Sequence, residues 1–242
     1  MIKKVIYSKK DLSKVYVKDP SKDVHMKFGM IKSSDLDKRE AKSNINQEFF
    51  ILDADLKDCF EKLNRDKQTV IPKDASIVLA HTLLNSNSVI ADIGTGAGGF
   101  ACFMSFYVNK VFSFDIDERA VELGRKNAEF LGAKNIEFSK LDIYNEKLPA
   151  ENLDLVFLDL PDPSKAVPNI KSSLKRGGYL VCYNPQITQH QELINNINKE
   201  EFIHLSTIEL IERDWEVGGR KARPDNKSIG HTAFLSFFRS VI

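Results

Sequence analysis

After Asn87 the sequence alternates between strand-like and helix-like segments, and this alternation constrains the fold more than any other feature. Seven apolar runs have the length and composition of β-strands: residues 88–93, 110–116, 135–142, 153–160, 177–184, 202–211 and 231–238. The segments expected to connect the first five as helices or short links are residues 99–107, 118–131, 145–149 and 165–175, and one more helix is expected at 189–199. Strands joined through helices lie parallel, whereas the last two strands have no helix between them. The sequence therefore predicts an α/β fold with a doubly wound, Rossmann-like seven-stranded sheet closed by an antiparallel edge hairpin.

The beginning of the chain follows a different pattern. Short strand-like runs separated by polar segments occur at residues 5–7, 14–19, 25–31 and 48–52. They predict a small β-rich domain, followed by a helix within 53–63. We expect the two domains to cover residues 1–66 and 67–242, and a second helix to run from Ala75 to Leu84 with Asp74 as its N-cap.

Basic residues are concentrated in the N-terminal domain. Residues 1–42 contain twelve Lys or Arg and six Asp or Glu, a surplus of six, while the whole chain carries a net charge of +1, so the rest carries about −5. This surplus fits contact with nucleic acid phosphates, and it fits an ordinary solvated surface equally well. A second basic stretch is expected on the long loop between the last two strands; its members are Arg220, Lys221, Arg223 and Lys227.

Several classes of protein are disfavoured by the sequence. The three cysteines, Cys59, Cys102 and Cys182, contain no CxxC pair, so neither a disulfide framework nor a zinc knuckle is expected. The five histidines show no metal-ligand spacing, and no metal is predicted. No apolar run reaches the roughly 18–20 residues that span a bilayer, and the basic start of the chain lacks the apolar stretch of a secretory leader. The expected location is the cytoplasm.

A glycine-rich loop follows the first strand of the second domain. Gly94, Gly96 and Gly98 stand between an apolar strand and a helix, where glycines let the backbone approach a nucleotide and present N–H groups to it. Asp115 ends the next strand, 21 residues after Gly94, and a carboxylate at that spacing accepts hydrogen bonds from both ribose hydroxyls. The loop therefore predicts a nucleoside ligand with an unphosphorylated ribose.

Further acidic residues lie at strand ends and distinguish between two such ligands. Asp92, Asp142 and Asp159 join Asp115 at the carboxyl ends of four consecutive strands, which meet in one crevice. Any one of them alone could be a turn or cap residue. NAD satisfies the glycines and Asp115, but Asp92 would lie near its phosphates. Charge complementarity favours S-adenosylmethionine, whose amino and sulfonium groups are cationic; Asp92 would hold the amino group and Asp142 would meet the adenine amino group.

Taken together, the motifs of the chain resemble those of class I S-adenosylmethionine-dependent methyltransferases, and more closely the tRNA (adenine-N1)-methyltransferases that modify the T-loop. The segments that carry the resemblance are His25–Ile31, Gln68–Asp74, IADIGTGAGGF, LDIYNE, LDLPDP, PQITQ and GHTAFL. The resemblance implies methyl transfer to N1 of adenine 58, with the neighbouring adenine 57 left open, in a tRNA substrate bound by a homotetramer. It also implies the cofactor-binding residues, which are Gln68, Asp92, Gly94, Thr95, Gly96, Ala97, Gly98, Gly99, Asp115, Asp142 and Asp159.

The same resemblance assigns the catalytic work to two residues. Asp159 would accept a hydrogen bond from the exocyclic amino group of adenine, with Pro161 and Pro163 stiffening its loop. Tyr183 either borders the target base or is a core residue with a satisfied hydroxyl. His231 is expected to hold a neighbouring loop more often than to act as a base.

Two positions depart from the pattern of the family. Ile71 stands where relatives often carry an aromatic residue or a histidine, and Ser164 stands where many carry tryptophan. Both departures weaken the expected stacking platform for the base.

Other functions remain open from the sequence. The chain could be a catalytically silent RNA-binding subunit, although the full set of glycines and acids argues against this. It could also be a small-molecule methyltransferase of the corrinoid type, or a protein-carboxyl methyltransferase, because these share the core. The basic N-terminal domain and the LDLPDP sequence favour RNA.

Overall fold

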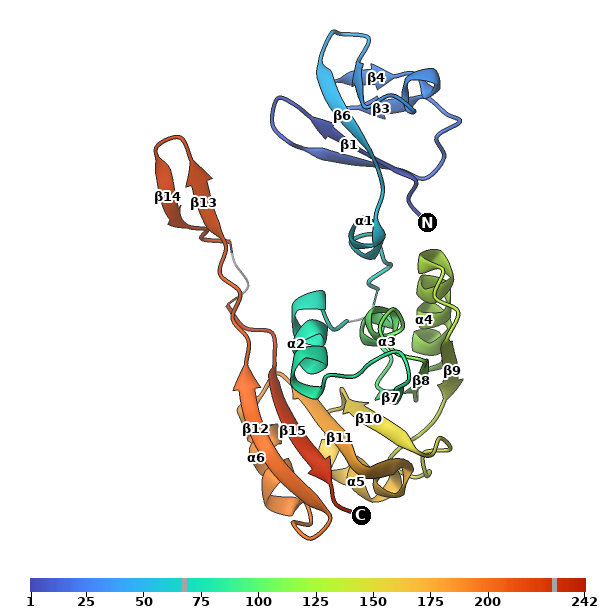
Figure 1. Ribbon diagram of the computed structural model, residues 1–242, viewed down its shortest axis with the longest axis vertical. Coiled ribbons are helices and arrows are strands. Elements are labelled where there is room, and N and C mark those ends of the chain that lie inside the picture. Colours follow the sequence, from blue (N-terminus) through green and yellow to red (C-terminus); the bar gives the residue numbers. More distant parts are fainter. Residues whose placement is uncertain (67–68, 228–229) are drawn as a thin grey trace. The chain divides into compact units, whose positions relative to one another are not determined.

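The computed structural model describes residues 1–66, 69–227 and 230–242 (Figure 1). The chain forms two compact units. The first contains Met1–Asn64 together with Phe130–Gly132, and the second contains Arg65–Glu129 and Ala133–Ile242.

The first unit is built on a four-stranded antiparallel sheet. Its strand order is β2-β1-β6-β5, with β1 at Lys4–Ser8, β2 at Lys14–Val17, β5 at Glu40–Lys42 and β6 at Glu48–Asp53. One face of β6 alternates inward at Phe49 and Ile51, which pack with Ile6, Val17 and Ile31 in a small core. Helix α1 (Leu56–Phe60) follows, capped by Asp55, whose carboxylate accepts from the amide of Asp58.

Two details of this unit differ from the prediction. Residues 25–31 do not form one strand: β3 (Val24–Met26) and β4 (Gly29–Ile31) pair as a short hairpin. Strand β5 lies inside residues 33–44, which the sequence predicted as a break, because three residues between polar neighbours give too little alternation to detect.

The second unit contains the seven-stranded sheet. Its order is β12-β15-β11-β10-β7-β8-β9, and all neighbours are parallel except where β15 pairs with β11 and β12. The strands are β7 (Val89–Ile93), β8 (Lys110–Asp115), β9 (Ile136–Lys140), β10 (Leu153–Leu158), β11 (Leu174–Asn184), β12 (Phe202–Glu209) and β15 (Phe234–Ser240). The predicted Rossmann-like sheet with an antiparallel edge pair is confirmed. From β7 the chain proceeds outward through β8 and β9, then returns to β10 on the other side, so the order reverses between β7 and β10.

Helices cover both faces of this sheet (Figure 1). Helices α2 (Pro72–Thr82), α3 (Gly99–Met104) and α4 (Glu118–Leu131) lie on one face, and α5 (Pro163–Ile170) and α6 (Ile187–Asn196) lie on the other. The central strand β10 is therefore mostly apolar, and its residues Leu155 to Leu158 are fully buried.

The start of α2 corrects a sequence prediction. The helix begins at Pro72 with Ile71 as its N-cap, so Asp74 lies inside the first turn and caps nothing. Proline favours the first helical position because its missing N–H has no partner there in any case. The prediction of Asp74 as a cap was therefore wrong, and its buried carboxylate has other partners, described below.

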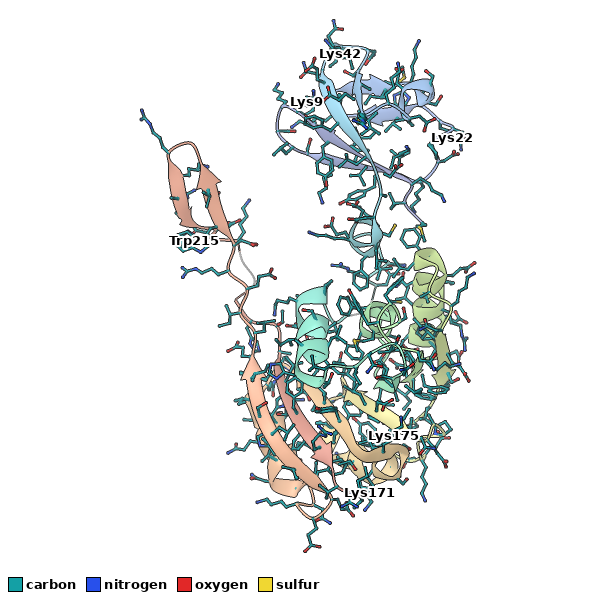
Figure 2. All side chains as sticks on the ribbon, in the orientation of Figure 1. Lys9, Lys22, Lys42, Lys171, Lys175 and Trp215 are labelled. Carbon is teal, nitrogen blue, oxygen red and sulfur yellow. The ribbon has the colours of Figure 1, made fainter. Side chains whose placement is uncertain are left out.

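The long segment between β12 and β15 is a second correction. Trp215–Gly218 (β13) and Lys221–Pro224 (β14) form an antiparallel hairpin where a loop was expected. Gly219 adopts the left-handed conformation, with φ of 57°, at the turn of this hairpin. Trp215 is more than half exposed and is labelled in Figure 2.

Candidate active site

The glycine loop after β7 is held in a conformation that only glycine tolerates. Gly94 has a φ of +99°, and a Cβ atom built on it would lie 2.2 Å from the carbonyl oxygen of Asp159. The backbone N–H groups of Gly94 and Thr95 both donate to the carbonyl oxygen of Phe114, at 2.8 and 3.1 Å. The loop is thus fixed between the ends of β8 and β10, the position at which open α/β sheets bind ligands.

Glycine is also required where the loop enters α3. Gly98 precedes the helix with a φ of +76°, and a Cβ there would approach Cα of Gly124 in α4 to 2.9 Å. At Gly99 a Cβ would approach the carbonyl oxygen of Val70 to 2.8 Å. Ala97 is buried, and its carbonyl oxygen accepts from Asn127 Nδ2 at 2.8 Å. The loop, α3 and α4 therefore form one closely packed frame.

Asp115 is attached directly to the glycine loop. Its Oδ2 accepts from the amide of Gly96 at 3.0 Å, and its Oδ1 accepts from the amide of Asp117 at 2.9 Å. Each carboxylate oxygen retains a lone pair that can accept from a hydroxyl group. Asp115 can therefore accept from the two hydroxyl groups of a ribose.

Asp115 also lines a cleft of about 280 Å³, a volume that includes open solvent. Its lining is mostly apolar, and the residues are Ile93, Gly94, Phe114, Asp115, Ile116, Leu141, Asp142, Ile143, Tyr144 and Leu160. Asp142 lines this cleft, but its carboxylate also accepts from the amide of Tyr144 and from Asn145 Nδ2, at 3.1 and 2.8 Å. Apolar walls with a few polar groups are typical of pockets for a purine ring.

Asp92 is a buried carboxyl group in the floor of the site. It is 1% exposed, and its Oδ2 accepts from Ser113 Oγ at 2.8 Å, which in turn lies 2.8 Å from Thr95 Oγ1. Its Oδ1 is buried without a hydrogen-bond partner in the described structure. Burial raises the pKa of Asp92 well above its ordinary value, and the charges of Asp159 and Asp115 add to this effect.

The acidic groups of the site fit S-adenosylmethionine. The unpartnered buried oxygen of Asp92 and the two neighbouring carboxylates, Asp115 and Asp159, favour a cationic ligand, because a positive charge there relieves their repulsion. A pyrophosphate would bring further negative charge to the same place. The site therefore fits S-adenosylmethionine better than a dinucleotide.

Asp159 occupies the end of β10, beside the glycine loop. Its amide donates to the carbonyl oxygen of Ile93 at 2.9 Å, while no hydrogen bond to its carboxylate is found within the described ranges. Burial, reinforced by the charge of Asp115, raises the pKa of Asp159 to about 7. A carboxyl group with free acceptor positions is suited to bind a donor on a ligand.

Tyr183 lies near the end of β11 and follows Cys182, which pairs with Leu158, the residue before Asp159. It is 5% exposed, and its hydroxyl donates to Asp74 Oδ2 at 3.1 Å. Burial raises the pKa of this hydroxyl, and the charge of Asp74 raises it further. The hydroxyl of Tyr183 is therefore satisfied within the protein, which leaves its ring as the part that could border a base.

Sequence reasoning missed the partners of Asp74. Lys73 Nζ donates to Asp74 Oδ1 at 2.5 Å, to the carbonyl oxygen of Leu210 at 2.8 Å and to Thr232 Oγ1 at 2.7 Å. All three ammonium donors are thus used, and the pair links α2 with the segments next to β12 and β15. A lysine followed by an aspartate at a helix start gave no signal of this, because the partners are more than 100 residues away.

His231 takes the structural role expected of it. Its Nδ1 lies 2.6 Å from Glu209 Oε1 and its Nε2 lies 2.8 Å from the carbonyl oxygen of Pro185. Both partners accept hydrogen bonds, so the imidazolium form satisfies both, and the bond to Glu209 raises the pKa of His231.

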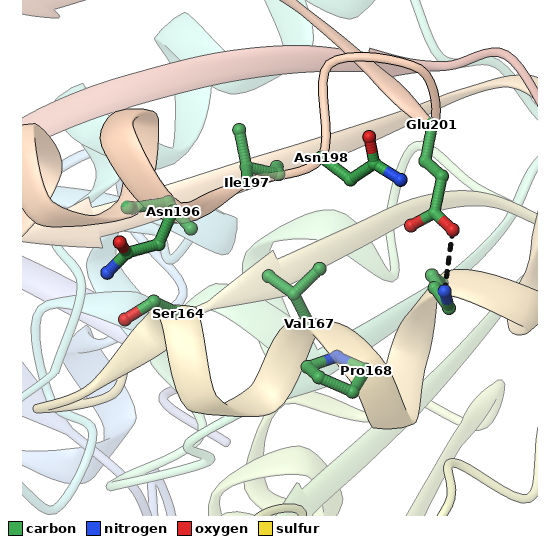
Figure 3. A pocket seen from close by; sticks show the side chains of 9 residues that line it. Ser164, Val167, Pro168, Asn196, Ile197, Asn198 and Glu201 are labelled. Atoms are coloured by element: carbon green, nitrogen blue, oxygen red, sulfur yellow. Dashed lines mark hydrogen bonds and ion pairs between the residues drawn. The ribbon is translucent and has the colours of Figure 1, made fainter.

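Some predicted features lie outside the ligand cleft or outside the described residues. Gln68 is not among the described residues. Ile71 is the N-cap of α2, and Ser164 lines a separate cavity of about 400 Å³, open solvent included, between α5 and α6. Figure 3 shows this cavity, with the ion pair between Lys171 and Glu201 at 2.6 Å at one end.

The described part of the chain offers no metal site: there, no cluster of three or more His, Cys, Asp or Glu side chains could hold a metal ion. None of the helices in residues 1–66, 69–227 and 230–242 is long and apolar enough to cross a membrane. Cys59, Cys102 and Cys182 are buried thiols.

Many of the basic residues expected to contact RNA have acidic neighbours. In the first unit Lys9 pairs with Glu40 at 2.5 Å, and Lys42 pairs with Glu48 at 3.1 Å; both lysines are labelled in Figure 2. On the hairpin, Lys221 and Arg223 share one partner, Glu216, at 3.4 and 3.0 Å. Ion pairs at the protein surface contribute little to stability, so they do not by themselves prevent these lysines and this arginine from contacting phosphate.

The sheet order, the glycine loop and the acids at the strand ends define a class I methyltransferase. Comparison with known proteins narrows this class. The family model described as tRNA methyltransferase complex GCD14 subunit matches residues 60–232, and the chain belongs to this family.

Two curated relatives illustrate the similarity. The tRNA (adenine(57)-N(1)/adenine(58)-N(1))-methyltransferase TrmI of Methanocaldococcus jannaschii is 27% identical over 242 residues, covering 88% of this chain and 86% of the relative. The tRNA (adenine(58)-N(1))-methyltransferase TrmI of Thermus thermophilus is 28% identical over 202 residues, covering 82% and 79%.

Solved structures share the fold. A tRNA (m1A58) methyltransferase TrmI from Aquifex aeolicus superposes with a TM-score of 0.84 at 22% identity, covering 99% of this chain and 97% of the other. An S-adenosylmethionine-dependent O-methyltransferase from Thermotoga maritima superposes with a TM-score of 0.89 at 24% identity, covering 100% and 93%. At these identities the structures establish the architecture alone.

Proposed function

We propose that this protein is a tRNA (adenine-N1)-methyltransferase that acts on adenine 58 of the T-loop with S-adenosylmethionine as the methyl donor. Membership of the family and the similarity to the two TrmI relatives support the reaction. The observation that carries the assignment of the site is the partly buried Asp159 carboxylate, unpaired within the described structure and in contact through its backbone with the glycine loop.

The glycine loop and three acids hold the donor. Asp115 accepts from the ribose hydroxyls, and Asp142 and the apolar walls of the cleft surround the adenine ring. The unpartnered Oδ1 of Asp92 accepts from the amino group of the methionine part. When bound, S-adenosylmethionine supplies an electrophilic methyl group. The backbone N–H groups from Thr95 to Gly99 and the segment containing Gln68 complete the proposed binding site.

Asp159 orients the target base. Adenine N1 carries its own lone pair, so the protein aligns the base and needs no residue to deprotonate the nucleophile. The Asp159 carboxylate accepts from the exocyclic amino group and offsets the positive charge that N1 acquires. Because burial raises its pKa to about 7, its ionised form is available at and above neutral pH.

Tyr183 acts in this proposal through its ring. Its hydroxyl is occupied by Asp74, and its ring centroid lies 5.9 Å from that of Phe157 in a tilted arrangement. The ring therefore forms a rigid wall beside Asp159 against which the base edge is placed.

The substrate is a folded tRNA, and two regions are proposed to contact it. The first is the N-terminal domain, residues 1–66, with its surplus of basic residues. The second is the hairpin β13–β14, which presents Arg220, Lys221 and Arg223 together with the exposed Trp215. Phosphate contacts fix the register of the RNA without reading its bases, and the T-loop adenine must be extruded to reach the site at a cost of a few kcal/mol.

The working assembly is proposed to be a homotetramer in the cytoplasm, in which the basic domain of one subunit helps bind RNA served by another. This assembly is proposed from the resemblance to the tRNA (adenine-N1)-methyltransferases alone. Mass determination in solution by light scattering tests this assembly; a monomer at assay concentration would refute it.

Mass spectrometry of nucleosides tests the reaction. Unmodified tRNA transcript incubated with the protein and S-adenosylmethionine is expected to gain N1-methyladenosine, and a transcript with adenine 58 replaced by uridine is the matched control. Asp159→Ala is expected to abolish transfer while donor binding, measured by calorimetry, survives. Equal activity in this variant would remove Asp159 from its role.

The same experiment separates the alternatives. A silent RNA-binding subunit would retain tRNA binding and yield no methylated adenosine. A small-molecule methyltransferase would bind the donor but not tRNA.

A further inference from the structure

The loop of residues 159–162, called the Asp159 loop here, is held by side chains from the end of β11 and the first turn of α6. Asn184 Nδ2 donates to the carbonyl oxygen of Leu160 at 2.6 Å. Gln189 Nε2 donates to the carbonyl oxygen of Pro161 at 2.7 Å. Two consecutive carbonyl groups directly after Asp159 are therefore bound by two amide side chains, one from β11 and one from α6.

A third contact completes this arrangement. The amide of Asp162 donates to the hydroxyl of Tyr144 at 3.2 Å. Pro161 has no N–H, so its carbonyl group is the one backbone group through which a side chain can hold it. Every residue of the loop after Asp159 thus has a backbone hydrogen bond to a side chain outside the loop.

The two amide side chains are themselves fixed in orientation. Asn184 is 2% exposed, and its Oδ1 accepts from Cys182 Sγ at 2.9 Å. Gln189 Oε1 accepts from the amide of Gln186 at 3.3 Å, as part of the capping box that begins α6. Because the oxygen of each amide is occupied, its nitrogen faces the Asp159 loop.

The Asp159 carboxylate depends on this support. Within the described structure no hydrogen bond holds the carboxylate itself, so its place is set by its backbone. On one side the backbone meets Gly94, where a Cβ would lie 2.2 Å from the Asp159 carbonyl oxygen. On the other side are the bonds from Asn184 and Gln189. A shift of the loop on that side moves the carboxylate relative to the base.

We infer that Asn184 and Gln189 are positioning residues for methyl transfer, which clamp the Asp159 loop so that its carboxylate meets the exocyclic amino group of the base. This inference rests on the proposed function of Asp159. It also gives a reason for glutamine as the last residue of the PQITQ segment. Gln189 caps α6 with its side-chain oxygen and clamps the Asp159 loop with its side-chain nitrogen.

Two substitutions separate the clamp from the cap. Gln189→Glu keeps an oxygen for the amide of Gln186 and removes the donor to Pro161. Gln189→Lys keeps a donor within reach of Pro161 and removes the cap acceptor. If the clamp matters for the reaction, Gln189→Glu lowers kcat by about 10-fold or more, since a displacement near 1 Å costs about 10²-fold. The kcat of Gln189→Lys then stays within about 3-fold of wild type, which corresponds to about 0.7 kcal/mol in activation free energy.

A matched control variant and a comparison of kcat with the binding constants complete the assay. Gln191→Glu introduces the same charge on α6 at an exposed position, and it is expected to leave kcat unchanged. KM for tRNA and the dissociation constant of the donor are expected to stay near wild type in Gln189→Glu. A role in helix capping alone predicts the reverse order, with Gln189→Lys the more damaged variant.

Hydrogen exchange provides a readout that needs no turnover. In Gln189→Glu, peptides that contain residues 159–162 are expected to exchange faster than in wild type, while peptides of β7 are unchanged. Unchanged exchange in the loop, or equal kcat in Gln189→Glu and wild type, would overturn the inference. If the wild-type protein fails to methylate tRNA, the proposed function fails, and the exchange experiment still decides whether the clamp exists.

Discussion

Asp159→Asn should make the protein more stable while removing its activity. The folded protein raises the pKa of Asp159 from 3.8 to about 7, so the folded state holds a proton that the unfolded state releases between these values. Stability therefore falls as the pH rises through this window. At about 1.4 kcal/mol for each pKa unit, the raised pKa lowers the stability by about 4 kcal/mol at pH 8, where the folded carboxyl group is ionised, and by about 2 kcal/mol at pH 5, where it is protonated, both as upper limits.

The asparagine removes this cost because it carries no charge at either pH. We expect denaturant titrations to show Asp159→Asn more stable than wild type by about 1–4 kcal/mol at pH 8, and by less at pH 5. The melting temperature should rise by roughly 2–4 °C for each kcal/mol in a chain of this size. Asp214→Asn, an exposed position, is the control and should change neither.

The pH dependence is what tests the reasoning. A gain of the same size at pH 5 and pH 8 would show that the stabilisation does not come from ionisation of Asp159. No gain at pH 8 would show that the site does not strain this carboxylate. In the wild type, kcat/KM for tRNA should rise with pH through about 7 as Asp159 ionises.

Three further predictions concern contacts at the site and in α5. Gly94→Ala should abolish donor binding in calorimetry, because the new Cβ would stand 2.2 Å from the Asp159 carbonyl oxygen at a φ of +99°. The control variant Ala97→Gly should still bind the donor, and tight binding by Gly94→Ala would contradict the loop geometry. Asp92→Asn should weaken donor binding about 10-fold or more at pH 8 by removing a charge-assisted hydrogen bond, and unchanged affinity would place the amino group elsewhere. Pro168→Ala should raise the melting temperature, because Pro168 stands exposed inside α5 without an N–H to donate to the preceding turn; a lower melting temperature would show that the proline is favourable there.

The strands and helices of the second unit could be predicted because their patterns are long. Helix α4 was predicted at the residues where it occurs, 118–131, since fourteen residues give four turns of periodicity. The hairpin β13–β14 was missed because each strand has four residues, and its side chains, exposed on both faces, show no alternation. Asp74 was interpreted as a cap because its residue type suits one, but Pro72 determined where the helix began.

In the candidate site, too, some residues could be predicted from the sequence and others could not. The glycines and the four acids follow from their place at strand ends, since parallel strands bring their carboxyl ends to one edge. The partners that fix them could not be predicted. Gln189 and Lys73 reach carbonyl groups 28 and 137 residues away, and a contact with a carbonyl group leaves no trace in the residue type of the partner.

The close approach of Gly94 to Asp159 has a consequence for redesign. Since the backbone of one loop rests against the carbonyl group of the other, an exchange of either loop between homologous enzymes has to preserve this close approach. A chimaera that imports a new base-recognition segment at 159–162 should receive residues 94–99 from the same parent. A parent with any other residue than glycine at position 94 would bring a Cβ atom against the carbonyl group of residue 159, and the two loops would not fit together.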